Sequence, residues 1–200
     1  MAEALKKLAL FCISAVALFV GYFGTKLLAP VGVPVGIWLD AYIPFAPAFI
    51  VPYLLFFPLL LVPWFLLWKN YREYKALAIG FILVSVVSAV IFVAYQTTGP
   101  RIGLQVTDWA TWLVSQIYSG DVNLNAFPSL HTAFSALIAA FVWKNYKGKW
   151  IGYGSLALAI LIVMSTVLIK QHGIVDVLGG LALAGFAYWA GRKVANNLWE

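Results

Sequence analysis

The stretch from Ser165 to Gly180 reads STVLIKQHGIVDVLGG, and it places Lys170, His172 and Asp176 among almost wholly apolar residues. Ionisable side chains within apolar, membrane-type segments are costly, and they usually face a protein interior or a water-filled cavity. His172 and Asp176 are four residues apart, so on a helix they share one face. The carboxylate could then hold one imidazole nitrogen while the other nitrogen faces a substrate. We therefore expect a functional site in this stretch.

The composition of the chain is that of a membrane protein. Of its 200 residues, 64% are hydrophobic and 10% are charged, whereas soluble domains carry about 25% charged residues. The length suits a single integral membrane domain, residues 1–200, of five to six helices at about 20 residues per span. The net charge of +6 does not indicate nucleic-acid binding, because the cations lie between apolar runs and not on one soluble face.

Six apolar runs are interpreted as membrane-spanning helices. They are Leu5–Leu28, Phe49–Trp68, Ala76–Tyr95, Pro128–Trp143, Trp150–Ile169 and Val175–Ala190. Between the first two runs, the apolar segment Pro30–Pro47 contains four prolines and cannot be a straight helix. We interpret it as re-entrant or interfacial, and its role stays open. Three prolines inside the second run predict a kinked or late-starting span.

The positive charges alternate along these runs. Ten of the thirteen cationic residues fall at every second boundary: Lys6, Lys7, Lys69, Arg72, Lys75, Lys144, Lys147, Lys149, Arg192 and Lys193. The positive-inside rule then places both termini in the cytoplasm. In the loop between the third and fourth runs, Asp108–Val114 has the pattern of a short amphipathic helix at the membrane interface. The predicted fold is an all-α bundle of six transmembrane helices.

This topology brings Arg101, His131, Lys170, His172 and Asp176 together at the extracytoplasmic ends of spans three to six. Two cations there could offset the charge of a phosphoryl group, and a helix that begins at Pro128 would direct free N–H groups at an anion. A histidine held by a carboxylate could attack phosphorus while a second histidine protonates the leaving oxygen. We expect no metal site, because the two cations would repel a divalent ion.

Two segments resemble motifs of the type 2 phosphatidic acid phosphatase superfamily, the lipid phosphate phosphatases. Pro128–His131 is similar to the family's Pro-Ser-Gly-His motif. Ser165, His172 and Asp176 fall in register with its third motif, which is Ser-Arg, five residues, His, three residues, Asp. The resemblance implies that His172 is the nucleophile, Asp176 its partner, His131 the general acid and Ser129 a phosphate-binding hydroxyl. Arg101 and Lys170 would bind the phosphate.

Some positions depart from that pattern. Leu130 stands for the glycine of the second motif and Thr166 for the arginine of the third, and Arg101 has Ala94 where the first motif has lysine. The segment Tyr95–Arg101 is more similar to the Tyr-Pro-Thr-Ala-Pro-Pro-Arg segment of the branch that includes inositol phosphoceramide synthases and their bacterial relatives. The acceptor therefore stays open, because it is water in a phosphatase and a lipid or polyol hydroxyl in a transferase.

We expect a membrane lipid phosphatase that acts through a phosphohistidine, without a cofactor, in a prokaryotic plasma membrane and with its site facing outside the cytoplasm. The resemblance implies phosphatidic acid, phosphatidylglycerophosphate or a polyprenyl diphosphate as substrate. The small extracytoplasmic loops favour a lipid that enters between helices. The lipid substrate and the bilayer are the expected partners, nucleic acid is not, and the oligomeric state stays open.

Two other functions fit the same residues. One is a head-group phosphotransferase that uses the same histidine. The other is a small transporter in which His131, Lys170, His172 and Asp176 line a proton or anion path. Structural roles are also open, because the His172–Asp176 pair could simply join helices, Lys170 could extend to the interface and Ser129 could only start a helix.

Overall fold

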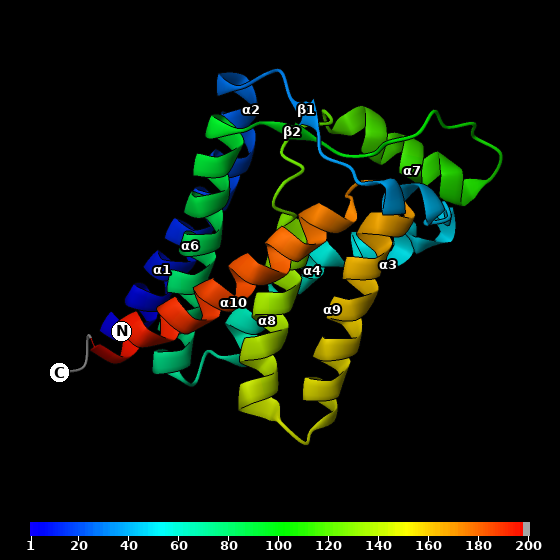
Figure 1. Cartoon of the computed structure of the whole chain (residues 1–200). Coiled ribbons are helices and arrows are strands. Elements are labelled where there is room, and N and C mark those ends of the chain that lie inside the picture. Colours follow the sequence, from blue (N-terminus) through cyan, green and yellow to red (C-terminus); the bar gives the residue numbers. More distant parts are fainter. Residues whose placement is uncertain (198–200) are drawn as a thin grey trace.

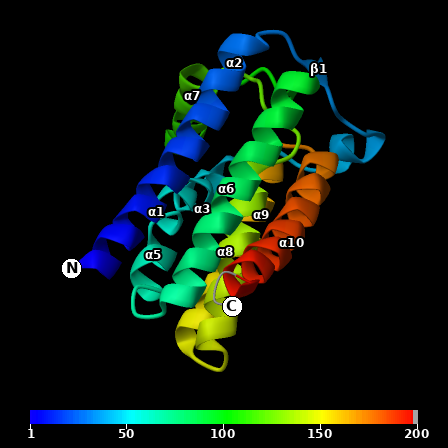
Figure 2. The ribbon, with the colours of Figure 1, turned by 90° about the vertical axis from the view of Figure 1, so that its left-hand side faces the viewer.

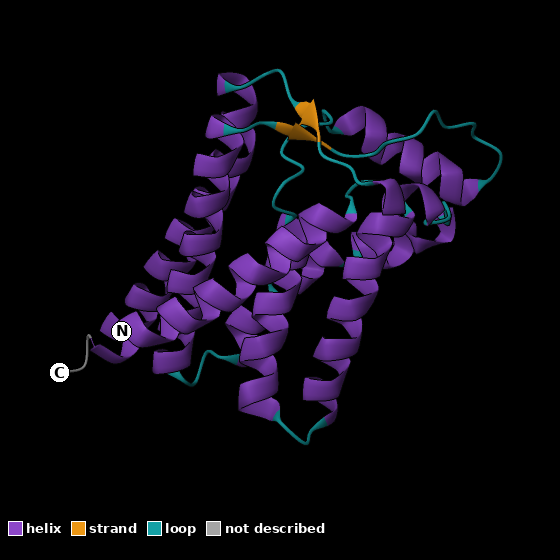
Figure 3. Ribbon diagram, viewed as in Figure 1, coloured by secondary structure: helices purple, strands orange, loops and turns teal. Residues whose placement is uncertain are grey.

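The computed structural model describes residues 1–197, and within them the chain is helical apart from two short strands (Figures 1 and 3). Successive long segments run in alternate directions. Both ends of the described chain and the connections 67–70 and 147–149 therefore lie at one end of the molecule (Figure 1). The segment 29–49, helix α7 and the start of α10 lie at the other end. The orientation of these two ends across a membrane stays a prediction.

The first apolar run is one long helical segment with a local change of pitch. It comprises α1 (Ala2–Phe19), a π-helical turn η1 (Val20–Gly24) and α2 (Thr25–Leu28). The segment packs along α6 (Tyr71–Ala94), as Figure 2 shows, and most of its remaining surface is exposed. π-Turns inside helices often mark functional sites, and this one carries Tyr22, which lies at the cavity described below.

The second run is broken, as its prolines predict. It forms α3 (Ile50–Leu54), α4 (Phe56–Leu59) and α5 (Val62–Leu66), preceded by the 3₁₀ turn η3 (Pro47–Phe49). Each proline lacks the N–H that a continuous helix would use, so the helical path is interrupted. The run therefore packs against the other helices as three short helices and not as one continuous helix.

Helices α6, α8 (Leu130–Tyr146) and α10 (Ile174–Asn197) form the centre of the molecule, and α9 (Trp150–Leu168) packs on α8. Their contact faces are apolar and fully buried, with Leu77, Phe134, Leu137, Ile138 and Phe141 at the core. At the end that carries the termini, the buried carboxylate of Glu73 pairs with Lys144 of α8, and Arg192 of α10 lies 4.0 Å away. This ion pair ties three helices together at one end of the core.

The segment between the first two runs is folded, but it is not a straight helix. Strand β1 (Val33–Pro34) pairs in parallel with β2 (Thr97–Thr98), and a 3₁₀ turn η2 (Trp38–Tyr42) follows β1. No local sequence pattern predicts this small sheet, which is coloured orange in Figure 3. Its consequence is that the segment 29–49 is held across the end of the bundle where the predicted site lies.

Helix α7 (Trp109–Gly120) occupies the loop in which the short amphipathic helix was predicted, and it is longer than expected. Asp108 caps it by accepting a hydrogen bond of 2.8 Å from the Thr111 N–H. That bond, with a second one from the Thr111 hydroxyl, holds the pKa of Asp108 below its ordinary value. The placement of α7 at a membrane interface stays a prediction.

Four of the six predicted spans are long and apolar enough to cross a membrane: Ala2–Leu28, Tyr71–Ala94, Trp150–Leu168 and Ile174–Asn197. The fourth predicted span, α8, is shorter at 17 residues, and the second is broken. The structure therefore confirms an all-helical protein with four candidate spans. The chain has the character of an integral membrane protein.

Candidate active site

Residues from distant parts of the chain meet at a cavity of about 460 Å³. His131 from the first turn of α8, His172 from the connection before α10 and Arg101 from the loop after β2 line its polar end. Most of the remaining wall is apolar and comes from α1 and the broken run α3–α5. Three of the six predicted site residues therefore share one cavity.

The two histidines face each other across this end of the cavity. Their ring centroids are 5.7 Å apart. The His131 ring also stacks on Tyr53, at 4.5 Å between centroids, and packs against Phe56 at 4.2 Å. Nε2 of His131 and Nδ1 of His172 are buried without a hydrogen-bond partner. Because buried polar atoms normally have partners, the unpaired Nε2 of His131 is a candidate for contact with a ligand, whereas Nδ1 of His172 faces a carboxylate.

Asp176 lies directly behind His172. It is fully buried in the first turn of α10, and its Oδ2 is 3.6 Å from His172 Nδ1. The same oxygen accepts a hydrogen bond of 2.8 Å from the Gly173 N–H, and Oδ1 has no partner. At 3.6 Å the imidazole and the carboxylate are not yet hydrogen-bonded. They are nevertheless placed to attract each other once the imidazole carries a positive charge.

The connection that carries His172 is hydrogen-bonded to the proline-rich segment 29–49. Asp40 accepts hydrogen bonds from the N–H groups of Ile174 (2.9 Å) and Ile37 (2.8 Å), so it caps the start of α10. In the other direction, the Lys170 ammonium donates to the carbonyls of Asp40 (3.0 Å) and Ile43 (2.6 Å). Asp40 is not among the site residues predicted from the sequence. Its one signal was an acid inside an apolar, proline-rich segment.

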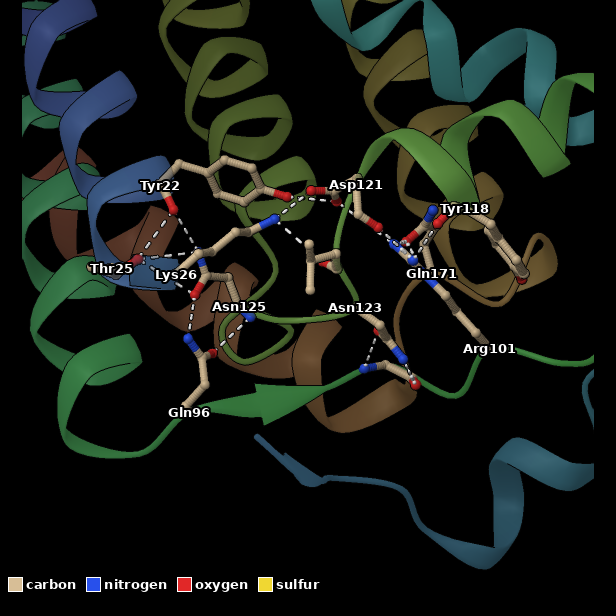
Figure 4. A network of polar contacts seen from close by, with 12 residues as sticks. Tyr22, Thr25, Lys26, Gln96, Arg101, Tyr118, Asp121, Asn123, Asn125 and Gln171 are labelled. Carbon is tan, nitrogen blue, oxygen red and sulfur yellow. Dashed lines mark hydrogen bonds and ion pairs between the residues drawn. The ribbon is translucent and has the colours of Figure 1, made fainter. Parts of the chain in front are cut away.

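Arg101 is held in place by a network that Figure 4 shows. Its Nη2 and Nε donate to Oε1 of Gln171, at 2.8 and 3.2 Å. Its Nη1 donates to the carbonyls of Asp121 (2.7 Å) and Tyr118 (3.1 Å), and the guanidinium lies over the Tyr118 ring. Burial raises the pKa of Tyr118 to about 12, so this ring is neutral. Gln171, which sequence reasoning missed, is therefore the group that an incoming anion would replace on Arg101.

Asp121 joins this arginine to the first helical segment. Its carboxylate pairs with Lys26, accepts a hydrogen bond of 2.8 Å from the Tyr22 hydroxyl and lies 3.6 Å from Arg101 Nη2 (Figure 4). One carboxylate thus faces two cations at the rim of the cavity. The local charge stays positive, which favours a negatively charged ligand.

A second part of the network fixes the loop that leads into α8. Asn125 donates to the carbonyl of Tyr22 at 2.8 Å and accepts from the Gln96 side chain at 2.8 Å, while its backbone N–H donates to the same glutamine at 2.7 Å. These bonds connect the end of the first helical segment, the start of β2 and the loop before His131 (Figure 4). The position of His131 thus depends on a buried polar network and not on α8 alone.

Ser129 and Lys170, predicted to bind phosphate, lie behind the cavity wall. Neither is among the described residues that line the cavity. Ser129 is fully buried, and its hydroxyl caps α8 by accepting a hydrogen bond of 3.3 Å from the Thr132 N–H. Its own N–H donates to the carbonyl of Asp176 at 3.0 Å, which joins α8 to α10 next to both histidines. Direct contacts of Ser129 and Lys170 with phosphate stay predictions.

Gly99 holds the Arg101 loop against the connection that carries His172. A Cβ at this position would lie 2.1 Å from the carbonyl oxygen of Gln171, so no other residue fits without movement of the backbone. We expect Gly99→Ala to destabilise the fold by about 1–3 kcal/mol and to separate Arg101 from Gln171. Thermal unfolding in detergent measures the first effect. Gly103→Ala in the same loop is the control, because a Cβ there meets nothing within 4 Å. Equal melting temperatures for the two variants would contradict the argument.

The described chain is therefore a largely helical membrane protein in which two histidines and an arginine line one cavity, with the buried carboxylate of Asp176 next to His172. Among residues 1–197, no group of three or more His, Cys, Asp or Glu side chains lies close enough to hold a metal ion. The chain belongs to the PAP2 superfamily, whose family model matches residues 27–190. This membership indicates phosphatase or phosphotransferase activity on phosphate esters. Searches of curated proteins and of solved structures gave no match.

Proposed function

We propose that this protein is a membrane-embedded lipid phosphatase that removes a phosphate from a lipid phosphate or diphosphate through a phosphohistidine. The observation that carries the proposal is the pair of rings at 5.7 Å, His131 and His172, which line one cavity together with Arg101. A phosphoryl group placed between the rings would have a nucleophile on one side and a proton donor on the other. Membership in the PAP2 superfamily supports this chemistry and gives no support to a transporter.

In the first step, Nε2 of His172 attacks phosphorus. The N–P bond forms as the bond from phosphorus to the lipid oxygen breaks, and that oxygen takes a proton from His131. Nδ1 of His172 faces Asp176 at 3.6 Å, and the carboxylate stabilises the positive charge that develops on the ring. In the second step, water loses a proton to His131 and attacks phosphorus. The N–P bond breaks and inorganic phosphate is released.

Positive groups around the phosphoryl oxygens stabilise the charge. Arg101 can exchange Gln171 for a phosphate oxygen and offer its planar fork. The N–H groups of Leu130 and His131 open α8, so no carbonyl within the helix can accept from them. Leu130 and His131 both line the cavity. The helix start therefore offers further donors to an anion, and Ser129 contributes at least by capping that turn.

We place six helical crossings in a prokaryotic plasma membrane, with both termini in the cytoplasm and the cavity on the outer side. The support is the charge distribution, because the ten cations that the positive-inside rule assigns to the cytoplasm belong to one end of the molecule and the site to the other. On this placement α7 lies at the outer interface, where its half-exposed Trp109 and Trp112 suit the headgroup region.

The experiment that tests the function is phosphate release by purified protein in lipid nanodiscs. Phosphatidic acid, phosphatidylglycerophosphate and undecaprenyl diphosphate are supplied in turn, and the preferred substrate names the lipid class. Each reaction is repeated with a diacylglycerol or polyol acceptor, and the products are separated. Release of inorganic phosphate supports the hydrolase. Transfer to the acceptor without release would identify the phosphotransferase, which shares the phosphohistidine and differs only in the attacking hydroxyl.

Asp40 is expected to position His172 without contacting the substrate. In Asp40→Ala the start of α10 loses its cap and the 170–174 connection loosens, so kcat should fall by about tenfold to a hundredfold while KM changes little. Asp40→Asn keeps an acceptor for one of the two N–H groups and should recover part of the loss. Asp108→Ala, which removes the cap of α7, serves as the control. The same fall in kcat for both variants would show a general loss of stability and contradict a positioning role.

A further inference from the structure

The cavity extends well beyond the histidines, along the first helical segment. On α1, the lining residues Phe11, Ala15, Leu18 and Phe19 recur at helical spacing and share one face. The opposite wall comes from the broken run and includes Phe56, Phe57, Leu60, Leu61 and Trp64. The residues at the polar end make up only a small part of this wall, and the rest is aromatic or aliphatic.

The extension has a closed floor and an open side. Phe56 and Trp64 of the broken run are 6% and 5% exposed, so they form the floor. On the rim, Phe19 of α1 is 63% exposed and Phe57 of α4 is 52% exposed, although both line the same cavity. The cavity therefore opens sideways between the first helical segment and the broken run, toward the space that lipid tails would fill.

The far end of the extension is closed by a ring contact. Phe11 and Trp64 meet edge to face with their centroids 5.3 Å apart. Phe11 and Phe23 are twelve residues apart, so the lined stretch of helix is about 18 Å long at roughly 1.5 Å per residue. This exceeds half of a hydrocarbon core of about 30 Å. The lined stretch is therefore long enough to hold a hydrocarbon chain that spans one leaflet.

The polar groups in the extension are already satisfied. The hydroxyl of Ser14, which lines it, donates to the carbonyl of Leu10 at 2.8 Å. Near the open side, the Tyr22 hydroxyl donates to Asp121. An occupant of this part of the cavity therefore gains by burying apolar surface and not by hydrogen bonding.

We propose that this extension is a binding channel for one hydrocarbon chain of the substrate. The chain enters sideways between α1 and α4–α5, and the length of the channel along α1 sets which chain lengths are preferred. The placement of the substrate's phosphate between His131 and His172 rests on the proposed function. The channel itself rests only on the shape and the apolar lining of the cavity. The proposal predicts that the preference for chain length is set by α1, a helix that takes no part in the chemistry.

Ala15 is the position at which this can be tested. It lies one turn from both Phe11 and Phe19, lines the channel and is exposed, so a large side chain there should fill the channel without disturbing the core. Hydrolysis of hexyl, dodecyl and hexadecyl phosphate is compared with that of p-nitrophenyl phosphate, which has no alkyl chain. In Ala15→Trp, KM for the dodecyl and hexadecyl esters should rise by about tenfold or more, because several methylene groups lose their burial. Values for the two short substrates should not change.

Ala9→Trp is the matched control. Ala9 lies on the same helix, is also exposed and does not line the cavity. It should leave all four KM values unchanged. If Ala15→Trp changes the p-nitrophenyl ester as much as the long esters, or does not change the long esters, the channel proposal is overturned.

A second measurement is independent of activity. Dodecyl phosphate with a photoreactive diazirine near the end of its chain is bound to the protein in nanodiscs and irradiated, and the labelled peptides are identified. Labelling of residues 11–23, lost in Ala15→Trp and kept in Ala9→Trp, supports the channel even if no substrate is hydrolysed. Labelling confined to other helices overturns it. A protein that labels at α1 but releases no phosphate would instead contradict the proposed function alone.

Discussion

His172→Ala should abolish phosphate release, with a fall in kcat of roughly a thousandfold or more. No other described side chain at the cavity combines a histidine nitrogen with a buried carboxylate behind it, since Asp176 Oδ2 lies 3.6 Å from His172 Nδ1. The alanine variant should keep its fold, because His172 makes no side-chain hydrogen bond in the described structure and its Nδ1 is unpaired. The loss therefore reports chemistry and not stability.

Three measurements make this result specific. Phosphate release by His172→Ala is compared with that of Ser155→Ala. Ser155 donates to the Gly152 carbonyl on α9 and does not line the cavity. Acid-labile, base-stable phosphate on the wild-type protein after rapid quenching identifies the phosphohistidine, and it should be missing from His172→Ala. In His131→Ala, kcat should fall far more for alkyl phosphates than for p-nitrophenyl phosphate, because the p-nitrophenolate leaving group needs no proton. Substantial turnover by His172→Ala would refute the mechanism.

Arg101→Ala should lower kcat by about a hundredfold to a thousandfold. The guanidinium is the one arginine group among the described residues that line the cavity, and it is aimed by four hydrogen bonds to Gln171, Tyr118 and Asp121. Arg101→Lys should recover only a small part of the activity, because an ammonium ion keeps the charge and loses the planar fork.

Added guanidinium chloride, at concentrations well below denaturing ones, should partly restore Arg101→Ala and leave Arg101→Lys unchanged. The matched control is Arg72→Ala, because Arg72 also forks onto an amide side chain, that of Asn196, but does so at the opposite end of the molecule. A melting temperature close to that of the wild type separates the catalytic effect from loss of the loop contacts. Equal activity losses in Arg101→Ala and Arg72→Ala would rule out phosphate binding by Arg101.

The elements of this fold follow from local patterns in the sequence. Apolar runs of helical length predict α1, α6, α9 and α10, because such runs can satisfy their own backbone hydrogen bonds in lipid only as helices. The prolines predict the break in the second run, and the alternation of cations predicts which helix ends lie together. The four-residue spacing of His172 and Asp176 predicts a shared helical face, but α10 begins only at Ile174, so the turn before the helix is what brings the His172 ring to 3.6 Å from the carboxylate. These patterns depend on neighbours within a few residues, so the sequence alone determined them.

The hydrogen-bond network of the site depends on contacts between residues far apart in the chain. Only the tertiary structure shows that the Arg101 guanidinium is occupied by the side chain of Gln171. It also shows that Lys170 donates to the carbonyls of Asp40 and Ile43, and that the Asp40 carboxylate caps α10. The physical reason is that backbone groups at helix ends and buried charges must find partners. Any of several polar side chains could have supplied those partners, and the packing of distant segments decides which one does. The side channel along α1 is likewise a property of how two helical segments are spaced, which no local pattern records.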